Sequence, residues 1–138
     1  MTSLNFYLSR IHILGALFVA VSLIAWSADW FGIVYVCPYC RLQRTVIGIL
    51  GFLMMFRGLH NILTAFIASV IGFMGAHVAA AQNFMGWLKI NKGTFEFKED
   101  LFIDPFLLSG AALFAIIAQV WLLVLSTRQN IRQKESRT

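Results

Sequence analysis

Cys37 and Cys40 are the only cysteines in the chain, and they form one CxxC motif around Pro38 and Tyr39. Proline suits the first position of a helix, where a backbone N–H has no partner within the helix. The motif therefore predicts a helix that begins at Pro38, with Cys37 at or near its N-cap. The free N–H groups and the dipole at a helix start favour a negative thiolate, and a low thiol pKa is what rapid disulfide exchange requires. The pattern indicates redox chemistry.

The composition places this motif in a membrane protein. The chain has 138 residues, of which 59% are hydrophobic and 12% are charged, and its mean hydropathy is +0.78. In soluble domains about a quarter of the residues are charged. A globular protein this small has no room to bury such an apolar majority. A soluble enzyme is therefore excluded. We expect membrane lipid, and no nucleic acid, among the partners of this chain.

Uncharged stretches predict an all-α membrane protein, a single domain over 1–138 made of a four-transmembrane-helix bundle. A crossing helix needs about 20 mostly apolar residues, and the stretch 45–56 between Arg44 and Arg57 is too short alone. The second helix must therefore begin near Pro38 and carry Arg41 and Arg44 in its first turns. The expected helices cover 11–29, 38–58, 61–85 and 105–127; the expected outer loops cover 30–37 and 86–104, and a solvated cytoplasmic tail covers 128–138.

The distribution of basic residues predicts the orientation. Four crossings put both termini on one side, which then holds six basic residues against five on the other. Without Arg41 and Arg44, which begin a helix, the ratio is six to three. Cytoplasmic loops are enriched in Lys and Arg, so we expect cytoplasmic N- and C-termini and an outward-facing cysteine pair. The six are Arg10, Arg57, Arg128, Arg132, Lys134 and Arg137.

Arg44 is the second candidate functional residue. It lies four residues after Cys40 and seven after Cys37, hence on the same helical face. An arginine within a membrane segment is a functional hypothesis by default, and a guanidinium one turn below a disulfide can hold a ligand carbonyl. For Arg41 we expect an ordinary contact with lipid phosphates.

His77 and Gln82 are weaker candidates on the third expected helix. His77 is placed towards the outer end, at the level of the cysteines, where it can contact a ligand or make a helix–helix hydrogen bond. Gln82, just beyond it, can donate to the same ligand or face the lipid headgroups.

The run Cys37-Pro38-Tyr39-Cys40-Arg41-Leu42-Gln43-Arg44, its continuation Val46-Ile47-Gly48-Ile49-Leu50-Gly51 and the short basic loop at Arg57 resemble the bacterial DsbB family of disulfide-forming quinone reductases. The resemblance implies a four-helix bundle in the bacterial inner membrane, with its active site facing the periplasm. It implies ubiquinone or menaquinone as cofactor, and a periplasmic thioredoxin-like partner of the DsbA type.

By the same resemblance, Cys37 and Cys40 are the catalytic redox pair and Arg44 contacts the quinone. His77 resembles the histidine on the family's third helix, which is often followed by glutamine four residues on; here Gln82 is five on. The chain departs from the family in its second outer loop, 89–104, which has no cysteine pair to take electrons from the partner. Either Cys37–Cys40 exchanges directly with the partner, or the electrons take another route, or the chain is a divergent member with a different function. The mechanism we expect is direct exchange, by attack at Cys37, taken as the more exposed sulfur.

Two other functions are compatible with the sequence. Cys37, Cys40 and His77 offer soft ligands for copper, zinc or mercury, so a metal-binding or metal-transporting membrane subunit is one alternative. A non-catalytic structural bundle is the other. Our main interpretation includes no metal ligand and is that of a membrane thiol–disulfide oxidoreductase.

Overall fold

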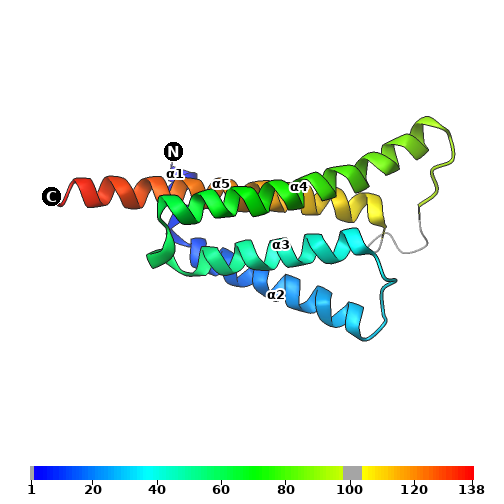
Figure 1. Ribbon diagram of the computed structural model, residues 1–138, viewed down its shortest axis with the longest axis horizontal. Coiled ribbons are helices and arrows are strands. Elements are labelled where there is room, and N and C mark those ends of the chain that lie inside the picture. The colour runs from blue at the N-terminus through cyan, green and yellow to red at the C-terminus, as the bar shows by residue number, and fades with distance from the viewer. Residues whose placement is uncertain (1, 98–103) are drawn as a thin grey trace.

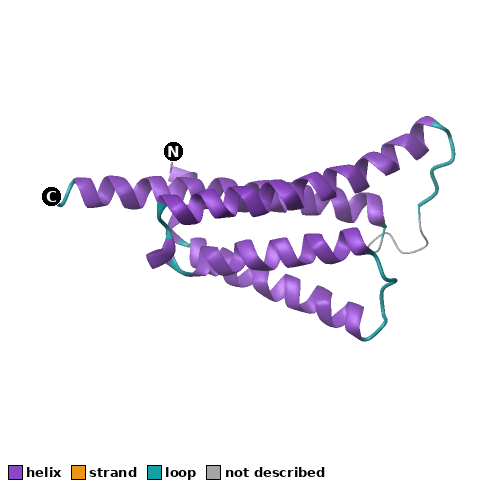
Figure 2. Cartoon of the chain, viewed as in Figure 1, coloured by secondary structure: helices purple, strands orange, loops and turns teal. Residues whose placement is uncertain are grey.

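A computed structural model describes residues 2–97 and 104–138, and the regular structure of these two segments is helical throughout (Figure 2). A short helix precedes the first apolar segment, and a single 3-10 turn separates the two middle helices. In chain order the elements are α1 (Thr2–Ser9), α2 (Ile11–Trp30), α3 (Pro38–Met55), η1 (Arg57–Leu59), α4 (Ile62–Asn91) and α5 (Pro105–Glu135).

The long helices form a bundle of two packed pairs. Helix α2 packs on α3, α4 packs on α5, and α3 also contacts both α4 and α5. The two termini lie at one end of the bundle, and the turn that leads into α3 lies at the other (Figure 1). The start of α3, where Cys37 lies, is therefore brought to the end of the bundle away from both termini.

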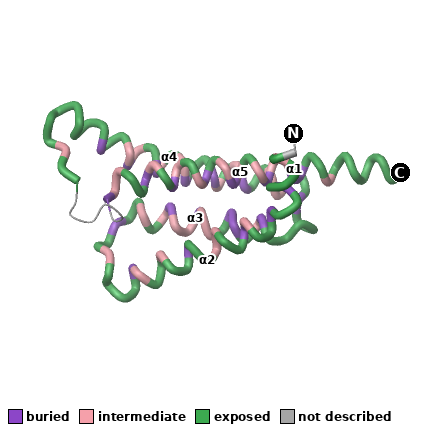
Figure 3. Tube along the Cα trace, turned by 180° about the vertical axis from the view of Figure 1, so that it is seen from behind, coloured by how far each residue is buried: buried purple, intermediate pink, exposed green. Residues whose placement is uncertain are grey.

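In the described part of the chain, three helices are long and apolar enough to cross a membrane: α2, α4 and α5. Their outward surfaces are exposed along most of their length (Figure 3), and large apolar side chains such as Leu23, Phe73 and Phe114 are among the exposed ones. Apolar surface on this scale indicates contact with lipid. The chain is therefore a membrane protein by its helices as well as by its composition.

Several helix ends differ from the expected ranges. Helix α4 continues to Asn91 rather than ending at 85, and α5 continues to Glu135. The expected tail 128–138 is thus mostly helical, because residues such as Gln129, Arg132 and Lys134 favour the helix intrinsically. The stretch 98–103 of the expected second outer loop lies outside the described residues.

Glycines allow α2 and α3 to approach closely in the middle of the bundle. A Cβ atom on Gly15 would lie 2.6 Å from the carbonyl oxygen of Gly51, and one on Gly48 would lie 2.6 Å from the hydroxyl of Ser22. Small residues at such contacts are typical of helices that pack within membranes. The Ser22 hydroxyl in turn donates a 2.8 Å hydrogen bond to the carbonyl of Arg44. Towards the cysteine end, α2 and α3 diverge (Figure 1).

Candidate redox site

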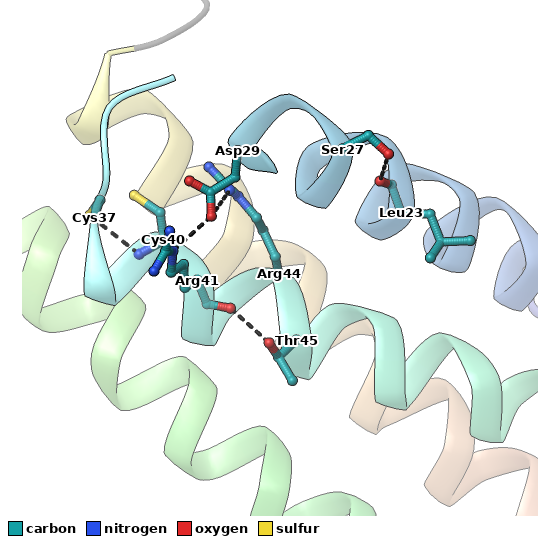
Figure 4. Close-up of polar contacts among 8 residues, drawn as sticks. All are labelled: Leu23, Ser27, Asp29, Cys37, Cys40, Arg41, Arg44 and Thr45. Carbon is teal, nitrogen blue, oxygen red and sulfur yellow. Dashed lines mark hydrogen bonds and ion pairs between the residues drawn. The ribbon is translucent and has the colours of Figure 1, made fainter. Parts of the chain in front are cut away.

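Cys37 is the N-cap residue of α3 and Pro38 opens the helix, which confirms the local structure predicted from the motif. Cys37 has an extended backbone, and its sulfur accepts a hydrogen bond from the backbone N–H of Cys40 at 3.3 Å (Figure 4). This bond satisfies one of the free donors at the helix start. It also holds the Cys37 sulfur beside the residue with which it would form a disulfide.

Gln82 of α4 contacts both sulfurs. Its amide nitrogen lies 3.6 Å from Sγ of Cys37 and 3.5 Å from Sγ of Cys40. Its amide oxygen accepts a 2.8 Å hydrogen bond from Gln43 of α3, which fixes the orientation of the Gln82 amide. Both glutamines are buried. The cysteine pair is therefore covered on the α4 side by an oriented amide donor.

Hydrogen bonds lower the pKa of the Cys37 thiol. Burial by itself would raise this pKa, but bonds from the thiol and the backbone N–H of Cys40, from the side chain of Tyr35 and from the backbone of Tyr39 outweigh burial. All of them favour the charged form of the sulfur. Cys37 is therefore the thiol that ionises below its ordinary pKa, as exchange chemistry requires.

We expect Tyr35→Phe to shift the alkylation of Cys37 by iodoacetamide to higher pH. Alkylation requires the thiolate, so a lowered pKa makes Cys37 react at a pH below the ordinary value of about 8.5, and loss of the Tyr35 bond raises that pH. The measurement is the alkylation rate at Cys37 against pH, read by mass spectrometry of the reduced chain. Tyr39→Phe is the matched control, because the contribution of Tyr39 comes from its backbone. An equal shift in both variants would contradict the assignment.

A single buried carboxylate lies beside both arginines of the motif. Oδ2 of Asp29, near the end of α2, accepts a 2.7 Å hydrogen bond from Nε of Arg41 and lies 3.6 Å from Nη1 of Arg44 (Figure 4). The side chain of Asp29 is 3% exposed and that of Arg44 is 17% exposed. A charge buried to this degree needs a charged partner. The sequence predicted a contact between Arg41 and lipid phosphates; in the structure Arg41 pairs with Asp29.

Arg44 and Cys40 open onto one apolar cavity of about 400 Å³ between α2, α3 and α5. Nη1 of Arg44 and Oδ1 of Asp29 are buried and have no hydrogen-bond partner among the described residues. Alanines on α2 and α5 provide the space, and apart from Gln43, Cys40 and Arg44 the described lining residues are apolar. The lining residues include Phe18, Val21, Ala25, Ala28, Cys40, Arg44, Ala111, Ala112 and Ala115.

Cys37 lines a second cavity, of about 360 Å³, which we call the loop cavity. It lies between the residues that precede α3, the C-terminal half of α4 and the start of α5. Its walls are more polar than those of the apolar cavity, and Gln82 belongs to the wall that α4 provides. The lining residues include Tyr35, Cys37, Gln82, Lys89, Phe95, Glu96, Asp104 and Phe106.

The exposure of the two sulfurs is the reverse of the expected order. Cys37 is buried, with 6% of its surface exposed, whereas Cys40 is partly exposed. Gln82, from a helix distant in sequence, contacts both sulfurs, so this contact does not account for the difference between them. Among the described residues, the open space that Cys37 borders is the loop cavity.

His77 lies apart from the sulfurs. It is exposed on α4, stacks on the ring of Phe73, and is not among the residues that line either cavity. Five residues separate it from Gln82, which is about 140° around a helix of 3.6 residues per turn. When Gln82 faces the sulfurs, His77 therefore faces away. Within the described segments, no group of three or more His, Cys, Asp or Glu side chains is arranged to hold a metal ion.

Asp29 and Gln43 are the site residues that sequence reasoning missed. Asp29 had a usable signal, because it is the only acidic residue before Glu96 and stands at the end of an apolar segment. An isolated acid there, with Arg41 and Arg44 in the next helix, indicates an ion pair. Gln43 had no comparable signal, since its role depends on the contact between α3 and α4.

Comparison of the chain with protein-family models, with curated protein sequences and with solved structures gives no match.

Proposed function

We propose that this chain is a membrane thiol–disulfide oxidoreductase of the DsbB type. In this proposal it passes electrons from a periplasmic thioredoxin-like dithiol protein, through the Cys37–Cys40 disulfide, to ubiquinone or menaquinone. The observation that carries the proposal is the division of the pair between two cavities. Cys37 lines the loop cavity, whereas Cys40 lines the apolar cavity together with Arg44. Such a pair can exchange with a protein on one side and with a lipophilic carrier on the other.

The apolar cavity fits a quinone headgroup in size and in chemistry. Small-molecule sites are mostly apolar, have volumes of roughly 300–1,000 Å³ and contain few polar groups, and this cavity meets each criterion. Arg44 offers a buried nitrogen without a hydrogen-bond partner among the described residues, suited to a carbonyl oxygen. When bound, a quinone supplies an acceptor for two electrons and two protons. The apolar walls, with Ala111 and Ala115, exclude water from Cys40.

The first half of the cycle reduces the chain. A partner thiolate attacks Sγ of Cys37 through the loop cavity, the Cys37–Cys40 bond breaks, and Cys40 leaves as a thiol after taking up a proton. The second partner thiol then attacks the partner's own sulfur in the mixed disulfide and releases Cys37. The partner leaves with a disulfide, and the two electrons and two protons it lost are held by Cys37 and Cys40.

The second half restores the disulfide. Cys40 lines the apolar cavity, and in this proposal the two electrons and two protons leave the pair on that side, to a quinone that the cavity would hold. As they leave, the S–H bonds of Cys37 and Cys40 are lost and the bond between the two sulfurs forms again. Cys37, whose pKa is lowered by its hydrogen bonds despite burial, ionises more readily than an ordinary thiol. The amide nitrogen of Gln82 contacts both sulfurs and so holds them near each other. Direct exchange at this pair replaces the relay through a second cysteine pair, which the chain lacks.

We place four helices across the bacterial inner membrane, with α3 as the fourth and both termini in the cytoplasm. Helix α3 is not among the described helices that are apolar enough to cross by composition alone, because Arg41, Gln43 and Arg44 lie in its first turns. Asp29 pairs with both of these arginines, which lowers the penalty of placing them at the membrane edge. The excess of basic residues on the side of the termini supports this orientation.

The test is a thiol count on the purified, reduced chain after addition of a ubiquinone or menaquinone analogue. We expect both thiols to disappear, with one quinol formed for each pair. Ala111→Leu narrows the apolar cavity and should slow this oxidation about tenfold or more, by overpacking. Ala80→Leu is the matched control, because Ala80 is exposed on α4 and lines neither cavity. If Cys37 and Cys40 stay reduced with every quinone, the proposal is wrong.

A further inference from the structure

A third cavity lies at the end of the bundle that carries the two termini, far from the cysteines. It has a volume of about 520 Å³ and lies between the η1 turn, the start of α4 and the end of α5. We call it the basic cavity, because Arg57, Lys134 and Arg137 line it and no acidic side chain is among its described lining residues. Three cations around one hollow are suited to an anion with several oxygen atoms.

The helical extension of α5 builds one wall of this cavity. Asn130, Gln133 and Lys134 follow the spacing of a single helix face and line the cavity, and Arg137, in the turn just after the helix ends at Glu135, lines it as well. Arg128 and Arg132 are exposed on α5 but do not line it. The basic residues of the terminal segment are thus divided between the cavity and the open surface.

The opposite wall is fixed by hydrogen bonds. Nη2 of Arg57 donates to the carbonyls of Leu8 and Ser9, at 2.7 and 3.0 Å, which anchors the guanidinium to the end of α1. Asn130 donates to the carbonyls of Arg57 and His60 and ties the turn to α5. The cavity is therefore a built feature of the fold rather than a gap between mobile side chains.

His60 does not add to the charge of the cavity. Burial lowers the pKa of His60, with a smaller lowering by Arg57 opposed by the hydrogen bond to the carbonyl of Leu53. Its ring nitrogens contact the Ser126 hydroxyl at 2.7 Å and the Leu53 carbonyl at 3.0 Å, which suits a neutral ring with its proton on Nε2. The positive charge comes from the three cations and from the N-terminus of α4, whose first residue, Ile62, lines the cavity.

Lipid-facing surface begins directly beside the basic cavity. Ile62, Leu63 and Phe66, in the first turns of α4, are 75%, 63% and 67% exposed. A ligand that places a phosphate in the cavity can therefore lay an acyl chain along α4. Basic pockets at the cytoplasmic ends of membrane helices are known to hold anionic lipid headgroups.

We propose that the basic cavity binds the phosphate of an anionic phospholipid headgroup, with Arg57, Lys134 and Arg137 as its cationic ligands. A zwitterionic headgroup is disfavoured, because its ammonium group would meet three cations and no lining carboxylate. The site is independent of the redox proposal, since it lies at the opposite end of the bundle.

The test compares ligands by the thermal unfolding midpoint of the purified full chain in detergent. We expect phosphatidylglycerol to raise the midpoint in a saturable way, and phosphatidylcholine and inorganic phosphate to leave it unchanged. An equal rise with inorganic phosphate would identify a site for free phosphate and overturn the lipid assignment. No rise with phosphatidylglycerol would overturn the site itself.

A pair of double variants separates a site from general surface charge. Lys134→Gln with Arg137→Gln should weaken phosphatidylglycerol binding about 30-fold, at roughly 1 kcal/mol for each basic residue. Arg128→Gln with Arg132→Gln removes the same charge from the same terminal segment, 128–138, outside the cavity, and should weaken binding less than threefold. Equal weakening in the two double variants would overturn the proposal. All four residues are exposed, so both variants retain the packed core.

Discussion

Cys40→Ser should abolish quinone reduction by dithiothreitol, with a loss of at least ~100-fold, and should leave Cys37 able to form a mixed disulfide. Removing a covalent nucleophile typically has an effect of this size or larger. Without Cys40 no intramolecular disulfide forms, so electrons cannot leave the chain as a pair. The measurement is the absorbance of the quinone during turnover, with Ser69→Ala as control, because the Ser69 hydroxyl bonds only within its own helix, to the carbonyl of Ala65.

The two cysteines should differ in trapping experiments. With an oxidised DsbA-type protein as probe, the Cys37 thiol of Cys40→Ser attacks the probe disulfide, and one probe thiol is released as the mixed disulfide forms. In Cys37→Ser the remaining thiol, Cys40, opens onto the apolar cavity, and we expect no trapped complex. If a complex forms equally well with Cys37→Ser, the proposal that Cys37 exchanges with the protein partner and Cys40 with the quinone side is wrong.

Arg44→Gln should raise the KM for quinone and lower kcat/KM by roughly 10- to 100-fold. This range corresponds to the loss of one hydrogen bond that the charged Arg44 guanidinium donates to a quinone carbonyl, about 1.5–3 kcal/mol. The variant retains the pairing of Asp29 with Arg41, at 2.7 Å, so the buried carboxylate keeps a cation. The measurement is steady-state quinone reduction over a range of quinone concentrations, with the dithiol held in excess.

Arg41→Gln is the matched control for this prediction. It removes a guanidinium from the same carboxylate, but Arg41 does not line the apolar cavity. We therefore expect a KM for quinone within about twofold of the unmodified chain. If Arg41→Gln and Arg44→Gln raise KM equally, the effect comes from Asp29 and its charge balance, and Arg44 has no direct contact with quinone.

The interactions among neighbouring residues were readable from the sequence. Pro38 and the position of Cys37 predicted the N-cap, and the spacing of Cys40 and Arg44 predicted that both side chains lie on one face of α3. Both interpretations depend on backbone geometry within two helical turns. The structure has Cys37 at the N-cap and brings Cys40 and Arg44 to one cavity.

The roles of residues on other helices were not readable in the same way. His77 and Gln82 were equally plausible ligands, and only the rotation of α4 about its axis separates them. That rotation depends on contacts such as Gly75, where a Cβ would lie 2.6 Å from the side chain of Val46. The burial of Cys37 follows from the same packing, because Gln82 covers its sulfur.

The sequence by itself determined that this is a helical membrane protein with a cysteine pair at the start of a helix, since apolar runs, capping and helical spacing are properties of adjacent residues. Only the tertiary structure decided which cysteine lines which cavity, that Asp29 pairs with Arg41 and lies beside Arg44, and that the end of α5 closes a basic cavity with Arg57. These features depend on how the helices cross and rotate, and contacts between residues far apart in the chain set that geometry.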